Sequence, residues 1–287
     1  MSNARKILLT SLAMLAFAGN SLLCRAALKQ TGIDAASFTT IRLISGALVL
    51  WLLVRLRRGT QPGDGNWLSA SALFVYAAGF SFAYISLTAS TGALLLFGAV
   101  QITMIGYGIW SGERLRSLQL VGLVLALAGL VGLLIPGLSA PPLYGSVLML
   151  AAGASWGVYS LRGRAAGDPI RVTAGNFLRA APIAAAMSLL MINGAELNNN
   201  GVWYAIASGA LTSGLGYAIW YTALPGLKAT HAATVQLSVP VLAGLAGIVF
   251  LGEPLSLRLV LASAAILGGI AMVILEKQKK DGALDRT

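Results

Sequence analysis

The sequence predicts an all-α polytopic membrane protein in which ten transmembrane helices form two inverted five-helix repeats. Three observations lead to this prediction: apolar segments fill most of the chain, the connectors between them are short, and only 10% of the residues are charged. A helix needs roughly 20 mostly apolar residues to cross a bilayer core of about 30 Å. Because an unpaired backbone cannot face lipid, we expect each apolar segment to cross as a helix.

The apolar segments follow one another along the whole chain. The ten predicted spans are residues 7–24, 37–54, 67–87, 93–110, 118–135, 143–161, 172–192, 202–224, 229–251 and 257–275. Almost nothing is left over for a soluble domain, so we expect the membrane bundle to make up the fold.

Lysine and arginine residues are unevenly distributed over the predicted connectors. If the N-terminus lies inside, all basic residues of the connectors and tails fall inside except Arg25, Lys29 and Arg258. Short cytoplasmic loops are enriched in Lys and Arg. We therefore expect a multi-pass protein of the bacterial inner (cytoplasmic) membrane with both termini in the cytoplasm. The net charge of +11 is then explained by orientation and by contact with membrane lipid, and no nucleic-acid partner is expected.

The two halves of the chain resemble each other at an offset of 137 residues, as between Arg25 and Arg162. The same offset relates Arg42 to Arg179, Phe80 to Tyr217 and Tyr84 to Tyr221, and a slip of three residues then relates Gly112-Glu113 to Gly252-Glu253. The pattern predicts a duplication, with one repeat in residues 1–138 and the other in residues 139–287. Because each repeat has an odd number of spans, the second must enter the membrane from the opposite face. Inverted repeats are typical of secondary transporters, whose substrates bind near the bilayer midplane between the repeats.

Two motifs carry a resemblance to a known family. An arginine lies in the second helix of each unit (Arg42, Arg179), and Gly-Glu follows the fourth (Gly112-Glu113, Gly252-Glu253). With the duplicated five-helix units, these motifs resemble the EamA-type units of the drug/metabolite transporter superfamily, over essentially the whole chain. Within it the chain most resembles the bacterial aromatic amino-acid exporters. The resemblance implies a central cavity lined by the first, third, fourth, sixth, eighth and ninth helices, with the fifth and tenth outside.

Aromatic residues of three predicted spans are candidate substrate-binding residues. They are Tyr76, Phe80 and Tyr84 in the third span, Trp156 and Tyr159 in the sixth, and Tyr217 and Tyr221 in the eighth. The three residues of the third span are four apart and share one helix face. Such walls suit a planar ring through stacking and edge contacts. Ordinary packing or contact with lipid is the alternative interpretation of each single aromatic residue.

Amide side chains inside the spans form a second group of candidates for binding substrate. They are Asn20 in the first span, Gln101 in the fourth and Gln236 in the ninth. An amide both donates and accepts hydrogen bonds, as a zwitterionic solute requires. Hydrogen bonding between helices is the alternative role.

Arg42 and Arg179 are the most costly residues of the predicted spans, because a cation in the bilayer must face protein or water, or reach the interface. One interpretation is attraction of a substrate carboxylate, and the other is a fixed partner within the protein. We hypothesise two ion pairs between the repeats, Arg42–Glu253 and Arg179–Glu113. Pro240 in the ninth span can kink its helix and is a candidate hinge.

Together these features predict a transporter that exports small organic solutes by alternating access, with aromatic or hydrophobic amino acids as substrates. No Asp or Glu lies within a predicted span, which favours facilitated diffusion or exchange over proton coupling. Drug-like cations and nucleoside-type metabolites are the alternative substrates. One His and one Cys without a carboxylate cluster provide neither a metal site nor an enzyme's reactive groups. We expect no cofactor and no obligate protein partner.

Overall fold

A computed structural model describes residues 3–57, 64–112, 115–137, 140–163, 168–223, 227 and 235–284. Within these residues the regular structure is entirely helical, and no β-strand occurs. The first half contains α1 (Asn3–Gln30), α2 (Ala35–Leu56), α3 (Trp67–Tyr84), α4 (Ala89–Trp110) and α5 (Ser117–Leu134). The second half contains α6 (Leu143–Gly163), α7 (Pro169–Leu190), η1 (Ile192–Gly194), α8 (Asn199–Ala207), η2 (Ser208–Leu215), α9 (Gly216–Ala223), α11 (Ser238–Leu251) and α12 (Leu257–Leu284). The segment α8–η2–α9 runs without interruption, and η2 is a stretch of π-helix.

Helices long and apolar enough to cross a membrane make the chain a multi-pass membrane protein by length and composition. In the described part of the chain they are α1, α2, α3, α4, α5 and α12. The remaining predicted spans coincide with α6, α7, the α8–η2–α9 segment and the shorter α11. The ends of the spans are less well predicted, since α1 has 28 residues where the apolar pattern predicts 18.

Polar residues in the short connectors determine where several helices begin. Asp34, Asn66 and Thr88 precede α2, α3 and α4, and each accepts a hydrogen bond from a backbone N–H three residues later. A capping side chain satisfies one of the N–H groups that a helix start leaves without a partner. Burial alone would raise the pKa of the Asp34 carboxyl. The hydrogen bonds that it accepts, from Ser37 above all, hold that pKa below its ordinary value.

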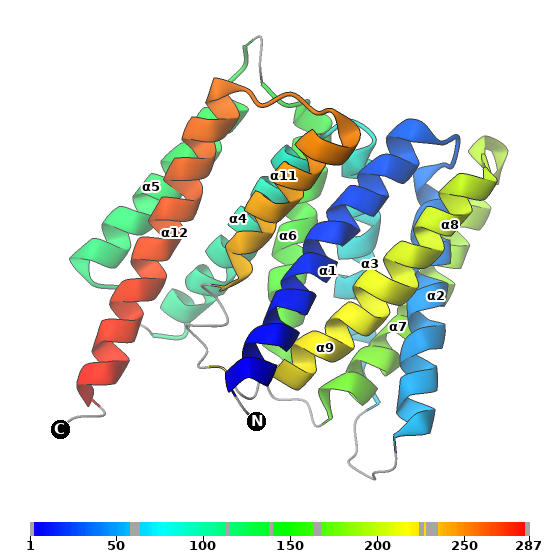
Figure 1. Cartoon of the computed structure of the whole chain (residues 1–287), viewed down its shortest axis with the longest axis horizontal. Helices are drawn as coiled ribbons and strands as arrows, with labels where there is room; N and C mark the ends of the chain where they lie inside the picture. The colour runs from blue at the N-terminus through cyan, green and yellow to red at the C-terminus, as the bar shows by residue number, and fades with distance from the viewer. Residues whose placement is uncertain are drawn as a thin grey trace.

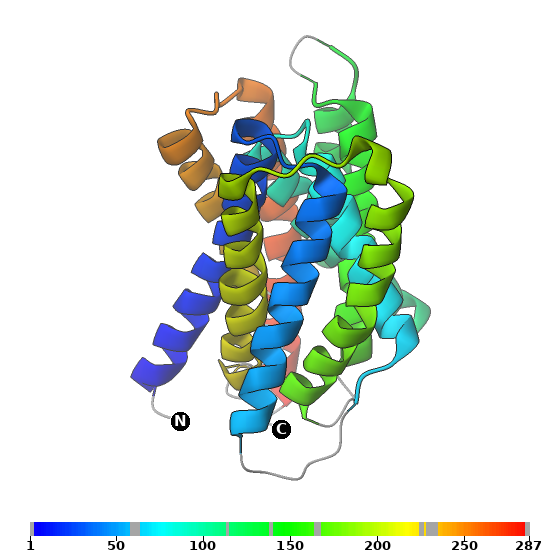
Figure 2. The ribbon, with the colours of Figure 1, turned by 90° about the vertical axis from the view of Figure 1, so that its right-hand side faces the viewer.

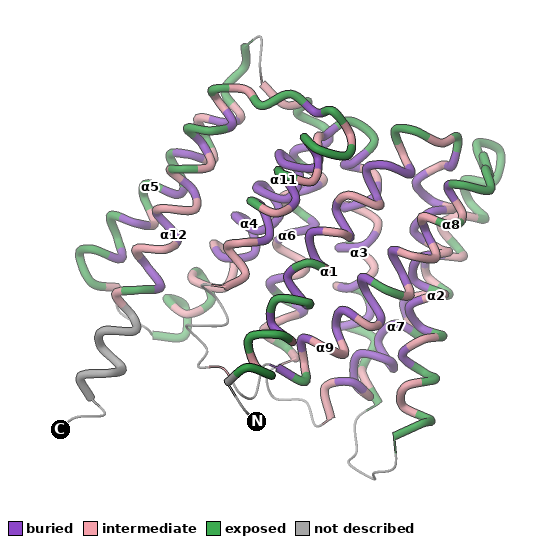
Figure 3. The backbone as a smooth tube through the Cα atoms, viewed as in Figure 1, coloured by how far each residue is buried: buried purple, intermediate pink, exposed green. Residues whose placement is uncertain are grey.

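The helices form one bundle in which α1 begins and α12 ends at the same end, here called the termini end (Figure 1). The opposite end is called the far end. Because α1 runs toward the far end and α6 runs away from it, the two halves begin in opposite directions (Figures 1 and 2). The buried residues lie where helices face one another, and α5 and α12 form a pair at one edge of the bundle (Figure 3).

The helices of the two halves pack in a pattern that largely repeats when the halves are exchanged. Three pairs join corresponding helices of the two halves: α5 with α12, α2 with α7, and α4 with α11. Most other contacts between the halves come in matching sets: α4 packs on α6 as α11 packs on α1, α3 packs on α6 as α9 packs on α1, and α3 packs on α7 as η2 packs on α2. The two halves are therefore interleaved, and residues from both meet in the middle of the bundle.

Small residues allow the closest of these approaches. A Cβ on Gly209 of η2 would meet the Arg42 carbonyl and the Ser45 hydroxyl of α2. In α6, a Cβ on Gly153 would lie 2.5 Å from the Leu96 carbonyl oxygen of α4. Small residues are the usual means by which membrane helices approach closely.

We expect Gly209→Ala to lower the free energy of unfolding by about 1–3 kcal/mol, the range for overpacking a tight site. The added methyl group would press on backbone atoms of α2, which cannot rotate away. Gly132→Ala is the matched control, because a Cβ there meets nothing within 4 Å. Thermal unfolding in detergent measures both variants. Equal melting temperatures for the two would contradict the close approach of η2 and α2.

Candidate functional site

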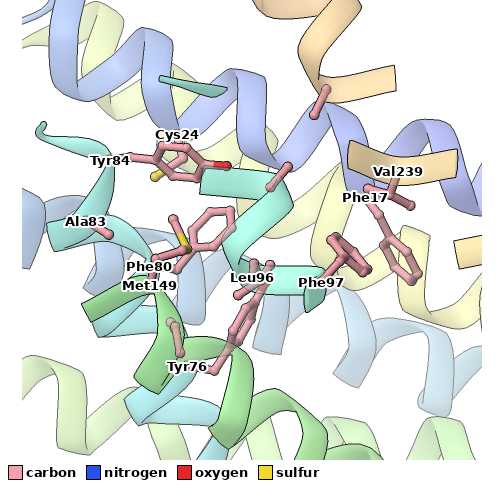
Figure 4. Close-up of a cluster of buried hydrophobic side chains, with 14 of the residues drawn as sticks. Phe17, Cys24, Tyr76, Phe80, Ala83, Tyr84, Leu96, Phe97, Met149 and Val239 are labelled. Carbon is pink, nitrogen blue, oxygen red and sulfur yellow. The ribbon is translucent and has the colours of Figure 1, made fainter. Parts of the chain in front are cut away.

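A small cavity lies in the interior of the bundle, where the two halves meet. Its volume is about 20 Å³, which is room for a water molecule and not for an amino acid. It is lined by Phe17, Asn20, Ser21, Tyr76, Phe80, Leu96, Phe97, Trp156, Thr212 and Tyr217. Figure 4 shows part of this lining, with Tyr76 and Phe80 beside Leu96 and Phe97. The conformation is therefore one in which the central cavity is closed around its own side chains.

Aromatic rings from both halves fill the space around this cavity. Trp156 of α6 lies between Tyr76 of α3 and Tyr217 of α9, with ring centroids 4.8 Å and 5.1 Å away. Phe80 packs 5.5 Å from Tyr76, and Phe17 of α1 meets Tyr217 edge-on. Tyr76, Phe80, Trp156 and Tyr217, all singled out from the sequence, thus line one cavity.

A buried polar network lies against the aromatic wall. Asn20 of α1 donates to the Tyr76 hydroxyl at 3.4 Å and accepts from the Ser208 hydroxyl at 2.6 Å. The Thr212 hydroxyl donates to the Ser208 carbonyl at 2.7 Å and lies 3.2 Å from the Asn20 carbonyl oxygen. Asn20 therefore links α1 and α3 of the first half to η2 of the second. A π-helical stretch is a frequent feature of functional sites.

Arg42 of α2 lies behind this network and is almost completely buried, with 1% of its surface exposed. Its Nη2 donates to the Tyr76 hydroxyl at 3.1 Å, and its Nε donates to the Ser213 hydroxyl at 3.4 Å. The guanidinium carbon lies 4.9 Å from the centre of the Phe80 ring. Its partners within the described residues are thus neutral.

An ion pair joins helices at the far end of the bundle. Arg25 of α1 donates from Nε to Oε1 of Glu253 at 3.0 Å and from Nη1 to the Tyr84 carbonyl at 2.8 Å. The second oxygen of Glu253 accepts the N–H of Ala89 at the start of α4, at 2.7 Å. Gly252 ends α11 with a φ of 63°, a conformation that glycine adopts easily, and the chain turns there. Arg25 and Glu253 thus join α1, α3, α4 and α11.

In this conformation the hypothesised Arg42–Glu253 ion pair does not form. Both oxygens of Glu253 are engaged by Arg25 and Ala89, whereas Arg42 bonds to hydroxyl groups. Both arginines lie toward the far end, where Glu253 also lies, but α11 packs on α1 and α4. The arginine of α1 therefore reaches Glu253.

A second cavity of about 20 Å³ lies at the termini end. Its lining includes Tyr159 and Tyr221, together with Arg162 and Asn176. The Tyr159 hydroxyl accepts a hydrogen bond from Asn176 at 3.3 Å, and the Tyr159 ring stacks on Trp156 at 5.4 Å. Trp156 and Tyr159 thus separate the two cavities, so Tyr159 and Tyr221 are not in the central one.

The other candidates lie apart from both cavities. Tyr84 is completely buried at the far end, where its hydroxyl donates to the Ala89 carbonyl. Gln101 is buried in α4, and Gln236 is half-buried just before α11. Arg179 donates to the carbonyls of Asp64 and Gly175 near the termini end.

Two further predictions concern the candidate hinge at Pro240 and the second hypothesised ion pair. Pro240 lies in the first turn of α11, which follows the helical residues Val235 and Gln236 and a turn at Leu237, so its role as a hinge stays a prediction. Glu113 lies outside the described residues, so its predicted pairing with Arg179 stays a prediction.

Several lining residues were not predicted. Phe17, Ser21, Leu96, Phe97 and Thr212 complete the cavity, and Ser208 and Ser213 complete the polar network. The small polar residues of η2 stand in a run of Ser, Gly and Thr that resembles a packing surface. The repeat offset could have pointed to Ser213, because it stands 137 residues after Tyr76. In the structure both residues bond to Arg42.

Comparisons with known proteins identify related sequences. The model of the EamA-like transporter family matches twice, at residues 4–135 and 143–275. A Pseudomonas aeruginosa protein described as uncharacterised is 58% identical, over 99% of this chain and all of that protein. The threonine/homoserine exporter RhtA of Escherichia coli is 32% identical, over 59% of this chain and 60% of RhtA. One solved crystal structure has the same fold, with a TM-score of 0.65 at 22% identity over 96% of this chain and 98% of that chain.

We expect Glu253→Gln to lower the free energy of unfolding by about 3–5 kcal/mol, because it leaves the buried Arg25 without a counter-charge. Arg25 and the N–H of Ala89 are both donors, whereas a glutamine amide has only one acceptor oxygen. Its NH2 group would therefore face one of these two donors. Glu276→Gln is the matched control, since Glu276 pairs with Arg116, which is largely exposed. Thermal unfolding of both purified variants is the measurement, and a melting temperature of Glu253→Gln as high as that of the control would refute this role.

Proposed function

This chain belongs to the EamA-like transporter family, and we propose that it is a secondary transporter that exports amino acids across the cytoplasmic membrane of a bacterium. Aromatic and hydrophobic amino acids are the proposed substrates. The observation that carries the proposal is the central cavity, where Tyr76 and Phe80 of one half face Trp156 and Tyr217 of the other. Ring-lined cavities at the junction of two repeats are suited to binding a planar apolar group.

The proposed mechanism is alternating access between two inverted repeats. It is supported by the packing of the helices, in which most contacts between the halves have a counterpart with the halves exchanged. The opposite directions of α1 and α6 are what an inversion requires (Figure 1). Such repeats can rock about a central site and open it to one side at a time.

The proposed orientation places the termini end in the cytoplasm. It is supported by the basic residues, which cluster in the connectors of that side. In this conformation the far end is held together by the Arg25–Glu253 ion pair. Export would then require the Arg25–Glu253 ion pair to break and the far end to open. The stacked rings of Trp156 and Tyr159 would meanwhile keep the path to the termini end closed.

Two observations bear on the substrate. RhtA is named a threonine/homoserine exporter, which makes small hydroxyl-bearing amino acids the second candidate. Drug-like cations fit less well, because no carboxylate is among the residues that line the central cavity. A cation buried in such a cavity would lack a counter-charge.

Counterflow in proteoliposomes tests the proposal. Vesicles loaded with unlabelled tryptophan or threonine should accumulate the corresponding labelled amino acid, and vesicles without protein should not. A panel of unlabelled amino acids and drug-like cations then competes with the label. Competition by cations and by no amino acid would reject the proposed substrate class. Currents far above the turnover of a carrier would reject the mechanism.

We expect Trp156→Ala to weaken competition by tryptophan and phenylalanine about threefold to tenfold, and competition by threonine much less. The reason is the loss of ring contacts worth about 0.5–1.5 kcal/mol each. Trp203→Ala is the matched control, because Trp203 lies in α8 with 68% of its surface exposed. Half-maximal inhibitory concentrations in counterflow give the comparison. A uniform loss for all amino acids would argue against a ring-binding role of Trp156.

A further inference from the structure

We propose that Arg42 is the receptor for a carboxylate of the transported solute, with Tyr76 and Phe80 standing between the guanidinium and the central cavity. This inference deepens the proposed function, on which it rests, by assigning the residue that selects for an anionic group. It excludes solutes that carry the same ring without a carboxylate.

The first line of support is the unsatisfied hydrogen bonding of Arg42. A guanidinium has five N–H donors in a planar fork. Among the described residues, Nε and Nη2 each bond to one hydroxyl, and Nη1 has no partner. Buried donors without partners are rare, and an unpaired nitrogen on a buried cation is the most costly kind.

The second line of support is the missing counter-charge. A buried charge is strongly unfavourable unless it is paired, and the cost is greatest in the bilayer. No carboxylate that the structure describes forms an ion pair with Arg42, and Glu253 is engaged by Arg25 and Ala89. The Phe80 and Tyr76 rings, 4.9 Å and 5.3 Å from the guanidinium carbon, compensate only part of the charge. An anionic ligand would supply what the protein lacks.

The third line of support is position. Tyr76 and Phe80 both line the central cavity, and both lie against Arg42. The Tyr76 hydroxyl accepts from Arg42 at 3.1 Å and from Asn20 at 3.4 Å, so it occupies the place of an acceptor at the edge of the cavity. A carboxylate that displaced this hydroxyl would meet Nη2 and the free Nη1 together. Two parallel N–H···O bonds are the favoured geometry between arginine and a carboxylate.

A pair of probes that differ only in the charged group tests the proposal on the intact protein. 3-Phenylpropionate and its amide have the same ring and chain, and only the first has a carboxylate. We expect the acid to raise the melting temperature of the purified protein at a concentration at least tenfold lower than the amide requires. Equal potency of acid and amide, or stabilisation by the amide alone, would overturn the proposal.

Substitution of the arginine then assigns the preference to this residue. We expect Arg42→Gln to fold, because removal of an unpaired buried charge is tolerated, and to bind the acid no better than the amide. Arg55→Gln is the matched control on the same helix, since Arg55 is exposed and lies over the Trp51 ring. Arg42→Lys keeps a charge but loses the fork, so its preference should fall between those of the wild type and Arg42→Gln. A full preference for the acid in Arg42→Gln would overturn the assignment. If that variant does not fold, the Lys variant decides, and an unchanged preference in it counts against the proposal.

The two proposals fail in different ways. Absence of counterflow for every amino acid, with the acid still preferred in the binding experiment, would reject amino-acid export and support the carboxylate receptor. Counterflow of amino acids that their amides inhibit equally well would support export and reject the receptor.

Discussion

The absence of water in the bilayer core is the constraint on which this structure depends, because every polar group there needs a partner within the protein. The backbone meets this need by forming helices, and single hydroxyl groups meet it by bonding to the preceding turn. Thr39 and Ser81, for example, donate to the carbonyls of Ala35 and Ala77 at 2.7 Å and 2.9 Å. Larger polar groups cannot be satisfied within one helix. They draw helices together, and the amide of Asn20 does so across the junction of the two halves.

The two buried arginines of the first half meet the same constraint in different ways. Arg25 has a carboxylate and two backbone carbonyls, so its charge is paired and it joins helices at the far end. Arg42 has two hydroxyl groups and aromatic faces, so its charge is only partly compensated. A fully engaged pair is costly to break, whereas a partly compensated cation gains from a new partner. The Arg25–Glu253 pair is therefore suited to holding helices together, and Arg42 is suited to binding an anionic group.

The sequence predicts the helical architecture and five of the ten residues that line the central cavity. It fails where the identity of the neighbouring helix decides which residues meet. Hydropathy fixes how deep a residue lies, so it places Arg42 and Glu253 near the same end of the bundle. It cannot say that α11 packs on α1, which brings Glu253 to Arg25 instead. The repeat offset is informative for Phe80 and Tyr217, which both line the cavity. One turn further, Tyr84 and Tyr221 lie toward opposite ends, because related residues of oppositely directed helices diverge by about 1.5 Å per residue in each helix.

The closed cavity also explains how binding and opening would be coupled. The Trp156 ring contacts those of Tyr76, Tyr159 and Tyr217, and three such contacts at about 0.5–1.5 kcal/mol each oppose its displacement. A solute with a planar ring restores these contacts in the opened cavity, and a solute without one does not. A ligand shifts a conformational equilibrium only by the difference in its affinity for the two states. Ring contacts with the wall and a carboxylate on Arg42 both exist only after the side chains part, so an aromatic amino acid would stabilise the open cavity through both of its ends.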